Sequence, residues 1–169
     1  MIKRSTFFLL IMVSIGCRLY AQTPVAFNAD LSSRADSFFR LGAIWGSKLE
    51  DISHASRNYE ELKPYRLRAT DYIDLQVNEL TLLKDVKDSK NMRLALIEFL
   101  KFEKTLINSS FMQIEKLPAK ATEQQMQLAF GSLEEASAKE EPYLMKLIQA
   151  QEAYAANNGF KVADEKAKR

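Results

Sequence analysis

Three polar residues interrupt apolar stripes of helical spacing, and their chemistry could serve a binding site. Glu79 shares an apolar face with Tyr72, Glu103 interrupts the stripe of a second predicted helix, and Gln151 that of a third. Inward-facing carboxylates of helical bundles can bind metal ions, as in di-iron proteins, which combine them with Glu-x-x-His motifs. The single histidine, His54, has no glutamate three residues before it. We therefore expect no metal site and no cofactor.

Two interpretations of these polar residues stay open at this stage. In the simpler one, each carboxylate lies at the margin of its stripe and pairs with a Lys, Arg or Tyr of a neighbouring helix, because buried charges need partners. In the other, the bundle interior contains a ligand pocket. That pocket would be lined by Trp45, Tyr72, Glu79, Glu103 and Gln151.

Two glycines one helical turn apart, Gly42 and Gly46, flank Trp45. Each costs a helix about 1 kcal/mol relative to alanine, so some packing feature should compensate. We expect another helix backbone to approach closely here; a small cavity beside Trp45 and a contact between copies are the alternatives. Arg40 and Lys48 interrupt any long apolar run, so the pair is not a membrane-dimer motif.

Composition and motifs exclude several functional classes. The 24 Lys and Arg residues are interleaved with 22 Asp and Glu residues, so no basic track for nucleic acid forms. The five glycines form no phosphate-binding loop, and no Gly-x-Ser-x-Gly motif is present. Ser53 and His54 are adjacent on one predicted helix and cannot face each other as nucleophile and base. We expect no catalytic residues and no enzymatic activity.

Residues 1–21 have the organisation of an export signal. Lys3 and Arg4 precede an apolar run over residues 7–13, and small or polar residues follow up to Ala21. The apolar run is shorter than the roughly 20 residues that a permanent membrane helix needs. We therefore expect cleavage after Ala21 and a protein that is periplasmic or extracellular.

A lipid anchor is the alternative to simple cleavage. Gly16 and Cys17 follow the apolar run directly, as in bacterial lipoproteins, and Cys17 is the only cysteine of the chain. Ser14, however, occupies a position that usually carries a branched apolar residue. Lipidation at Cys17 would make the protein an outer-membrane lipoprotein. Simple cleavage would instead leave 21 basic against 22 acidic residues and no cysteine, which excludes thiol catalysis and zinc–thiolate sites.

The rest of the chain is predicted to be helical, and no segment alternates with the period of a strand. Thr122 and Gln125 have the spacing of a capping box at the start of the last helix, and Pro142 should kink or break that helix. We expect one all-α domain over residues 22–160, an antiparallel up-down four-helix bundle, followed by a flexible tail at residues 161–169. The four helical segments are expected at residues 30–57, 64–87, 91–116 and 122–157.

The C-terminal string from Gln151 through Tyr154, Ala155 and Asn158 to Phe160 resembles a family of bacterial surface proteins. Members of this family, often lipoproteins, are described from leptospires. The upstream residues Leu94, Glu98, Phe99 and Glu103 add to the resemblance. It implies an exported all-α protein and assigns neither an activity nor functional residues. The chain departs from the family in lacking a strong lipoprotein cleavage site.

Together, these features predict an exported, non-enzymatic helical bundle of the bacterial envelope. Its expected partner is an envelope protein or a surface component, with no nucleic acid, and with membrane attachment only through a lipid on Cys17. The alternative is a periplasmic bundle that binds a small ligand or a metal through inward-facing carboxylates.

Overall fold

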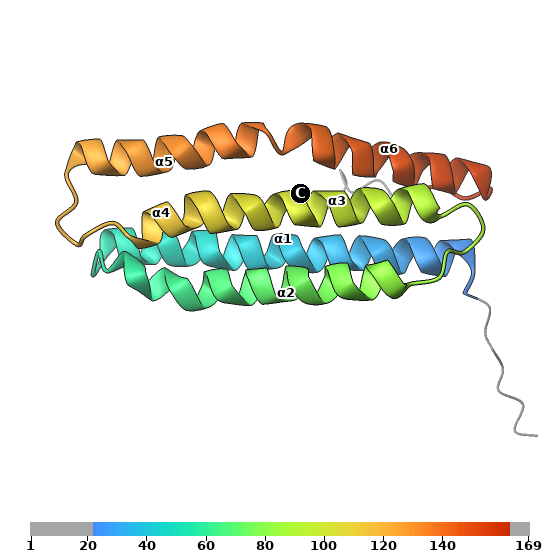
Figure 1. Ribbon diagram of the computed structural model, residues 1–169, viewed down its shortest axis with the longest axis horizontal. Coiled ribbons are helices and arrows are strands. Elements are labelled where there is room, and N and C mark those ends of the chain that lie inside the picture. Colours follow the sequence, from blue (N-terminus) through green and yellow to red (C-terminus); the bar gives the residue numbers. More distant parts are fainter. Residues whose placement is uncertain (1–21, 163–169) are drawn as a thin grey trace, which may run out of the picture.

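The computed structural model describes residues 22–162, which are helical and contain no strand. The predicted signal segment and residues 163–169 of the predicted tail lie outside this range. Four antiparallel rods form the predicted bundle (Figure 1): α1, α2, α3 continued by α4, and α5 continued by α6. Their bounds are α1 Pro24–His54, α2 Lys63–Leu82, α3 Lys90–Leu106, α4 Met112–Glu115, α5 Glu123–Ala138 and α6 Glu141–Asn157. A short 3-10 helix, η1 (Tyr59–Leu62), precedes α2, and a π-helical turn, η2 (Ile107–Phe111), joins α3 to α4.

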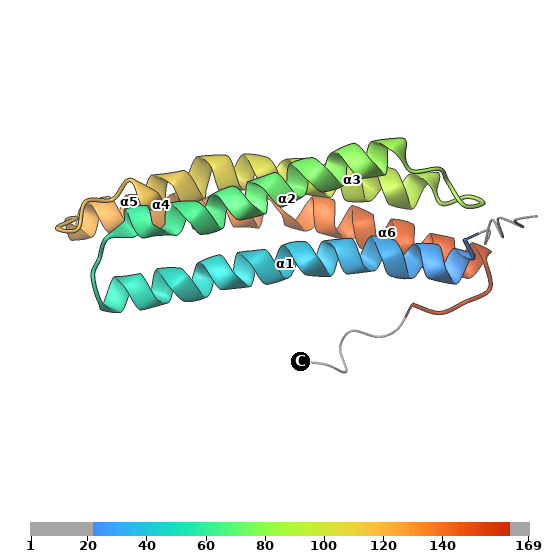
Figure 2. The ribbon, with the colours of Figure 1, turned by 90° about the horizontal axis from the view of Figure 1, so that it is seen from below.

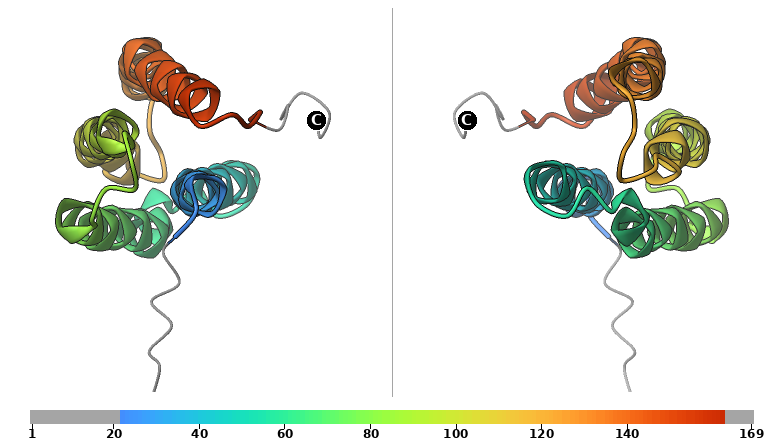
Figure 3. Two further views of the ribbon diagram at one scale, coloured as in Figure 1. Left: turned by 90° about the vertical axis from the view of Figure 1, so that its right-hand side faces the viewer. Right: turned by 90° about the vertical axis from the view of Figure 1, so that its left-hand side faces the viewer.

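Seen along its axis, the bundle follows an arc from α1 through α2 and α3 to α6 (Figure 3). Each of these helices packs extensively on the next one, whereas α6 contacts α1 in fewer places. The half of the last rod formed by α5 packs on α3, η2 and α4, and it makes no comparable contact with α1. Helix α1 runs along nearly the whole length of the bundle (Figure 2). The bundle is therefore least tightly closed between α1 and the α5–α6 rod.

Helix α1 begins six residues earlier than the periodicity predicts. The Thr23 side chain accepts a hydrogen bond from the backbone N–H of Ala26 (3.2 Å), and Pro24 follows in the first turn, where its missing N–H costs nothing. Phe27, one turn before Leu31, is fully buried and extends the apolar stripe toward this cap.

Helix α2 ends at Leu82, so its predicted extension to Lys87 is wrong. The guanidinium of Arg93 donates to the carbonyl of Leu80 (3.1 Å) and to both carboxylate oxygens of Asp85 (2.7 and 3.0 Å). Lys87 has a left-handed backbone (φ 54°), which no helix continues through. The C-terminal end of α2 is thus fixed by a residue of the following helix.

The structure confirms the predicted start and break of the last rod. Thr122 and Gln125 form the capping box in both directions. The rod bends by 30° between α5 and α6, and Pro142 lies in the first turn of α6, where it removes no helical hydrogen bond. Helix α6 ends at Asn157, just before Gly159, which adopts a left-handed backbone (φ 72°).

Two apolar clusters fill the bundle. The larger one joins α1, α2, α3 and α6 around Phe38, Ile73, Phe99 and Tyr154. The smaller one lies at the end of the bundle near α4 and contains Trp45. Side chains of all four rods therefore share the core.

Candidate functional site

The structure does not bring the five predicted site residues to one pocket. Trp45 lies in the smaller apolar cluster, 2% exposed, with its ring stacked on Phe111 (centroids 3.8 Å apart, planes at 16°). Its indole N–H has no hydrogen-bond partner among the described residues. Phe111 covers one face of the Trp45 ring, so the residue contributes to packing at this position.

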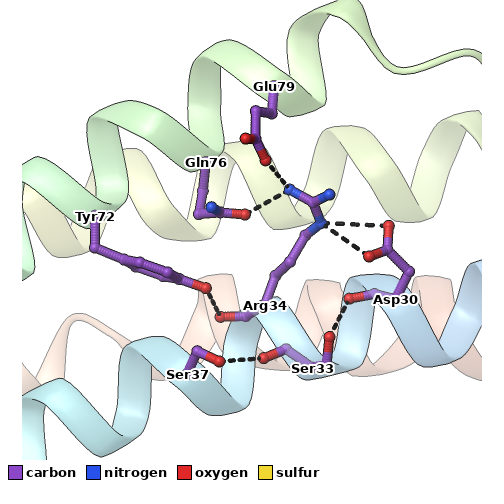
Figure 4. Close-up of polar contacts among 7 residues, drawn as sticks. All are labelled: Asp30, Ser33, Arg34, Ser37, Tyr72, Gln76 and Glu79. Atoms are coloured by element: carbon purple, nitrogen blue, oxygen red, sulfur yellow. Dashed lines mark hydrogen bonds and ion pairs between the residues drawn. The ribbon is translucent and has the colours of Figure 1, made fainter.

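Tyr72 and Glu79 belong to a polar network between α1 and α2, which centres on Arg34 (Figure 4). One terminal nitrogen of Arg34 contacts Glu79 Oε2 (2.6 Å) and Gln76 Oε1 (2.5 Å), and its Nε faces both carboxylate oxygens of Asp30 (3.3 Å). The Tyr72 hydroxyl donates to the backbone carbonyl of Arg34 (2.9 Å). Glu79 is thus a half-exposed carboxylate paired across helices, as the simpler interpretation expects.

Glu103 lies on α3 opposite the bend of the last rod, 5% exposed, and its Oε1 atom has no hydrogen-bond partner among the described residues. Burial raises the pKa of Glu103 to about 8, with further contributions from the negative charge and hydrogen bonding of Glu140. Burial also raises the pKa of Glu140, opposed by its hydrogen bond with Glu103. The Glu103 carboxyl therefore holds its proton at neutral pH and can donate it to Glu140. Ionisation of both carboxyl groups of a contacting pair is unfavourable, because the two negative charges repel each other.

The helix geometry around this carboxyl pair is irregular on both sides. The π-helical turn η2 begins at Ile107, one turn after Glu103, and Glu140 occupies the break between α5 and α6. Within η2, the Ser110 hydroxyl donates to the backbone carbonyl of Ser132 in α5 (3.3 Å). Sequence reasoning identified Glu103 from its stripe but missed Glu140, because a residue beside a helix break has no fixed face.

Gln151 lies beside a groove between α1 and α6. Its side-chain amide donates to the Ser32 hydroxyl across the two helices (2.8 Å). The groove has a volume of about 190 Å³. Its lining residues are Leu31, Ser32, Ala35, Asp36, Phe39, Met92, Leu144, Leu147, Ile148 and Gln151. Of the five predicted site residues, only Gln151 lines this groove.

The predicted close helix contact at Gly42 and Gly46 is wrong. A Cβ atom added to either glycine meets no other atom within 4 Å, apart from its immediate surroundings in α1. No neighbouring backbone approaches because α5, which runs past this part of α1, makes no comparable contact with it. The glycines are thus not required by packing within the described chain.

A buried ion pair that the sequence did not reveal lies near the α4 end of the bundle. Arg66 Nε donates to both carboxylate oxygens of Glu115 (2.8 and 2.9 Å), and Arg66 Nη1 donates to Asn108 Oδ1 (3.3 Å). The two charged side chains are 8% and 6% exposed. The pair links α2 to α4 over 49 positions of sequence, a separation at which no spacing rule applies. Its geometry is that of a structural clamp.

Within residues 22–162, no group of three or more His, Cys, Asp and Glu side chains is arranged to hold a metal ion. None of the described helices combines the length and the apolar character that a membrane span requires. The chain matches no protein-family model, and no curated protein or solved structure is significantly similar to it. The comparisons therefore assign no family, and the class defined by the structure is an all-helical, four-helix protein.

Proposed function

We propose that this protein is an exported, non-enzymatic helical bundle of the bacterial envelope that acts by binding an envelope protein or surface component. One observation carries the binding role. Leu67, Leu75 and Leu82 follow one another along α2 at intervals of eight and seven residues and are 41%, 54% and 84% exposed. Residues seven apart lie about 20° apart around a helix and residues eight apart about 80°, so the three leucines share one broad exposed side of α2, which we call the α2 stripe.

An exposed apolar stripe is unfavourable in water unless a partner covers it. Single exposed apolar residues are ordinary on protein surfaces, whereas large apolar patches mark interaction sites. The exposed Asp71 and Asn78 lie between the three leucines, so a partner of the α2 stripe would meet apolar and polar side chains in alternation. The inner face of the same helix is already committed to the core, because Ala69, Ile73 and Leu80 are fully buried. The α2 stripe is therefore an additional apolar face and not an incompletely buried core face.

The charged groups of the described chain support a non-enzymatic role. Four of the eight ion pairs among the described residues join different helices, as Lys104 does with Asp74 (2.6 Å) and Lys146 with Glu98 (2.5 Å). Active sites usually gather perturbed titratable groups with a nucleophile in a cleft. The strongly perturbed carboxyl, Glu103, is 5% exposed, so a substrate in solution has little access to it.

Export and the resemblance to leptospiral-type surface proteins are also part of this proposal, and the sequence alone supports them. The structure gives the residues of the C-terminal string an anchoring role. Tyr154 donates to the carbonyl of Val86 (3.1 Å), and Asn158 contacts Asp88 (2.8 Å). The ring of Phe160 packs edge-on against Tyr154. The string thus fixes the end of α6 to the α2–α3 connection.

Site-specific photo-crosslinking in a bacterium that exports the protein tests the binding role. A photoreactive phenylalanine analogue at position 75 samples the α2 stripe, and the same analogue at Ser47, an exposed position on α1, is the matched control. We expect a discrete adduct from position 75, which Leu67→Lys with Leu82→Lys abolishes, and none from position 47. Equal labelling from both positions would contradict the proposal. So would catalytic turnover by the purified protein that Glu103→Gln abolishes.

The groove beside Gln151 favours a second candidate function, the binding of a small ligand. Seven of its ten lining residues are apolar. Apolar cavities with a few polar groups are the usual form of small-molecule sites.

A further inference from the structure

We propose that the groove between α1 and α6 binds a small alkylammonium ligand, with a short apolar body and one cationic amine. The amine would contact Asp36 and Gln151 at the rim, and the apolar body would lie between the two helices. This inference deepens the second candidate function and is independent of the α2 stripe.

The walls of the groove suit an apolar body. Helix α1 contributes Leu31, Ala35 and Phe39, and α6 contributes Leu144, Leu147 and Ile148, with Met92 from α3. The ring of Phe39 is 41% exposed although it lies 5.6 Å from the ring of Phe99. A ligand that covers this ring removes apolar surface from water, which favours binding.

The size of the groove limits the apolar body. An engineered cavity of about 150 Å³ with apolar walls holds benzene, which has six carbons. The groove volume of about 190 Å³ therefore accommodates roughly eight carbon atoms by proportion.

The charge of the groove selects a cation. Asp36 is the only charged residue among those that line it. Two other acids on α1 have ion pairs, Asp30 with Arg34 and Asp51 with Lys48, and the exposed Glu50 has none among the described residues. Asp36 has no such pairing within residues 22–162. An unpaired carboxylate beside apolar walls favours an ammonium group over a carboxylate ligand.

A second polar group at the same rim can contact the amine. Ser32 and Asp36 are four residues apart on α1 and therefore lie on the same face. The amide nitrogen of Gln151 is bonded to the Ser32 hydroxyl, which leaves Gln151 Oε1 available as an acceptor. An ammonium group carries three N–H donors, so it can bond to both the Asp36 carboxylate and this oxygen.

Titration of the purified protein with n-octylammonium, followed by amide chemical shifts, tests the proposal. Octanoate is the control for the charge, and ethylammonium is the control for the apolar body. We expect octylammonium to shift the amides of residues 31–39 and 144–151 and to bind more tightly than either control. Equal binding of octanoate, or shifts confined to other parts of the bundle, would overturn the inference.

Two variants add independent tests. Asp36→Asn should weaken octylammonium binding about five-fold, the effect of losing one partly exposed ion pair, whereas Asp71→Asn, an exposed acid on α2, should leave it unchanged. Ile148→Lys should abolish binding, because its own ammonium group reaches the rim near Asp36. Unaltered binding by both Asp36→Asn and Ile148→Lys would refute the site. Because the probe binds α1 and α6, its failure leaves the α2 stripe and its crosslinking test unaffected.

Discussion

The buried carboxyl of Glu103 should make the protein lose stability as pH rises through the neutral range. Its pKa is about 8 in the folded protein, against an ordinary value of 4.5. The folded state therefore retains a proton that the unfolded state releases, so stability is complete below about pH 4.5 and falls as pH rises toward 8. The difference between these two pKa values lowers the free energy of unfolding by about 1 kcal/mol at pH 5 and by about 3 kcal/mol at pH 7, relative to its value below pH 4.5.

The substitution Glu103→Gln removes this titration and keeps a donor that can face Glu140. We compare the free energy of unfolding of the variant with that of the wild type at each pH. This difference, variant minus wild type, should be about 2 to 3 kcal/mol larger at pH 7 than at pH 5. Urea unfolding followed by circular dichroism at pH 5, 6, 7 and 8 measures the difference. Asp85 and Asp88, whose pKa values are lowered by hydrogen bonds, titrate below this range.

Two further variants separate burial from the effect of the neighbouring carboxyl. Burial is the largest cause of the raised Glu103 pKa, so Glu140→Gln should retain most of the pH dependence. Glu152→Gln, an exposed position on α6, is the matched control and should retain all of it. Parallel stability curves for wild type and Glu103→Gln between pH 5 and 8 would refute the assignment of a buried, protonated carboxyl.

Two other predictions concern stability and use the same unfolding assay. Gly42→Ala and Gly46→Ala should each raise the free energy of unfolding by about 1 kcal/mol, because an added Cβ meets open space and alanine favours the helix. A loss of stability would instead indicate a contact that the described chain does not contain. Arg66→Met should cost about 3 to 5 kcal/mol, because Glu115 is then buried without its partner, and adding Glu115→Gln should recover most of that loss. A double variant as unstable as Arg66→Met would contradict this explanation.

The fold could be predicted because helical periodicity is a local property that the core enforces. Phe38, Trp45 and Ile52 follow the predicted stripe of α1 and are buried. The boundaries were less predictable where distant residues decide them. The end of α2 depends on Arg93, which belongs to α3, and no local pattern signals that contact.

The candidate site was predictable only in part, for a related reason. The stripe of α3 singled out Glu103, which lies one turn from Phe99, but left open whether its side chain lies at the margin of the stripe or faces inward; the structure buries it. Its partner Glu140 and the π-helical turn depend on how α3 meets the bend of the last rod. Gly42 was misinterpreted because a glycine in a helix shows that a side chain is missing and does not show what occupies the space.

Native mass spectrometry of the protein purified from an exporting bacterium tests the central claim most directly. We expect a chain of residues 22–169 in the exported fraction. Its native mass should include a bound partner, and denaturation should return the mass to that of the chain alone. A chain that begins at Cys17 with added lipid mass would assign a membrane anchor in place of simple cleavage. An uncleaved chain of residues 1–169 in the cytoplasm, with no bound partner, would contradict the proposal of an exported binding protein.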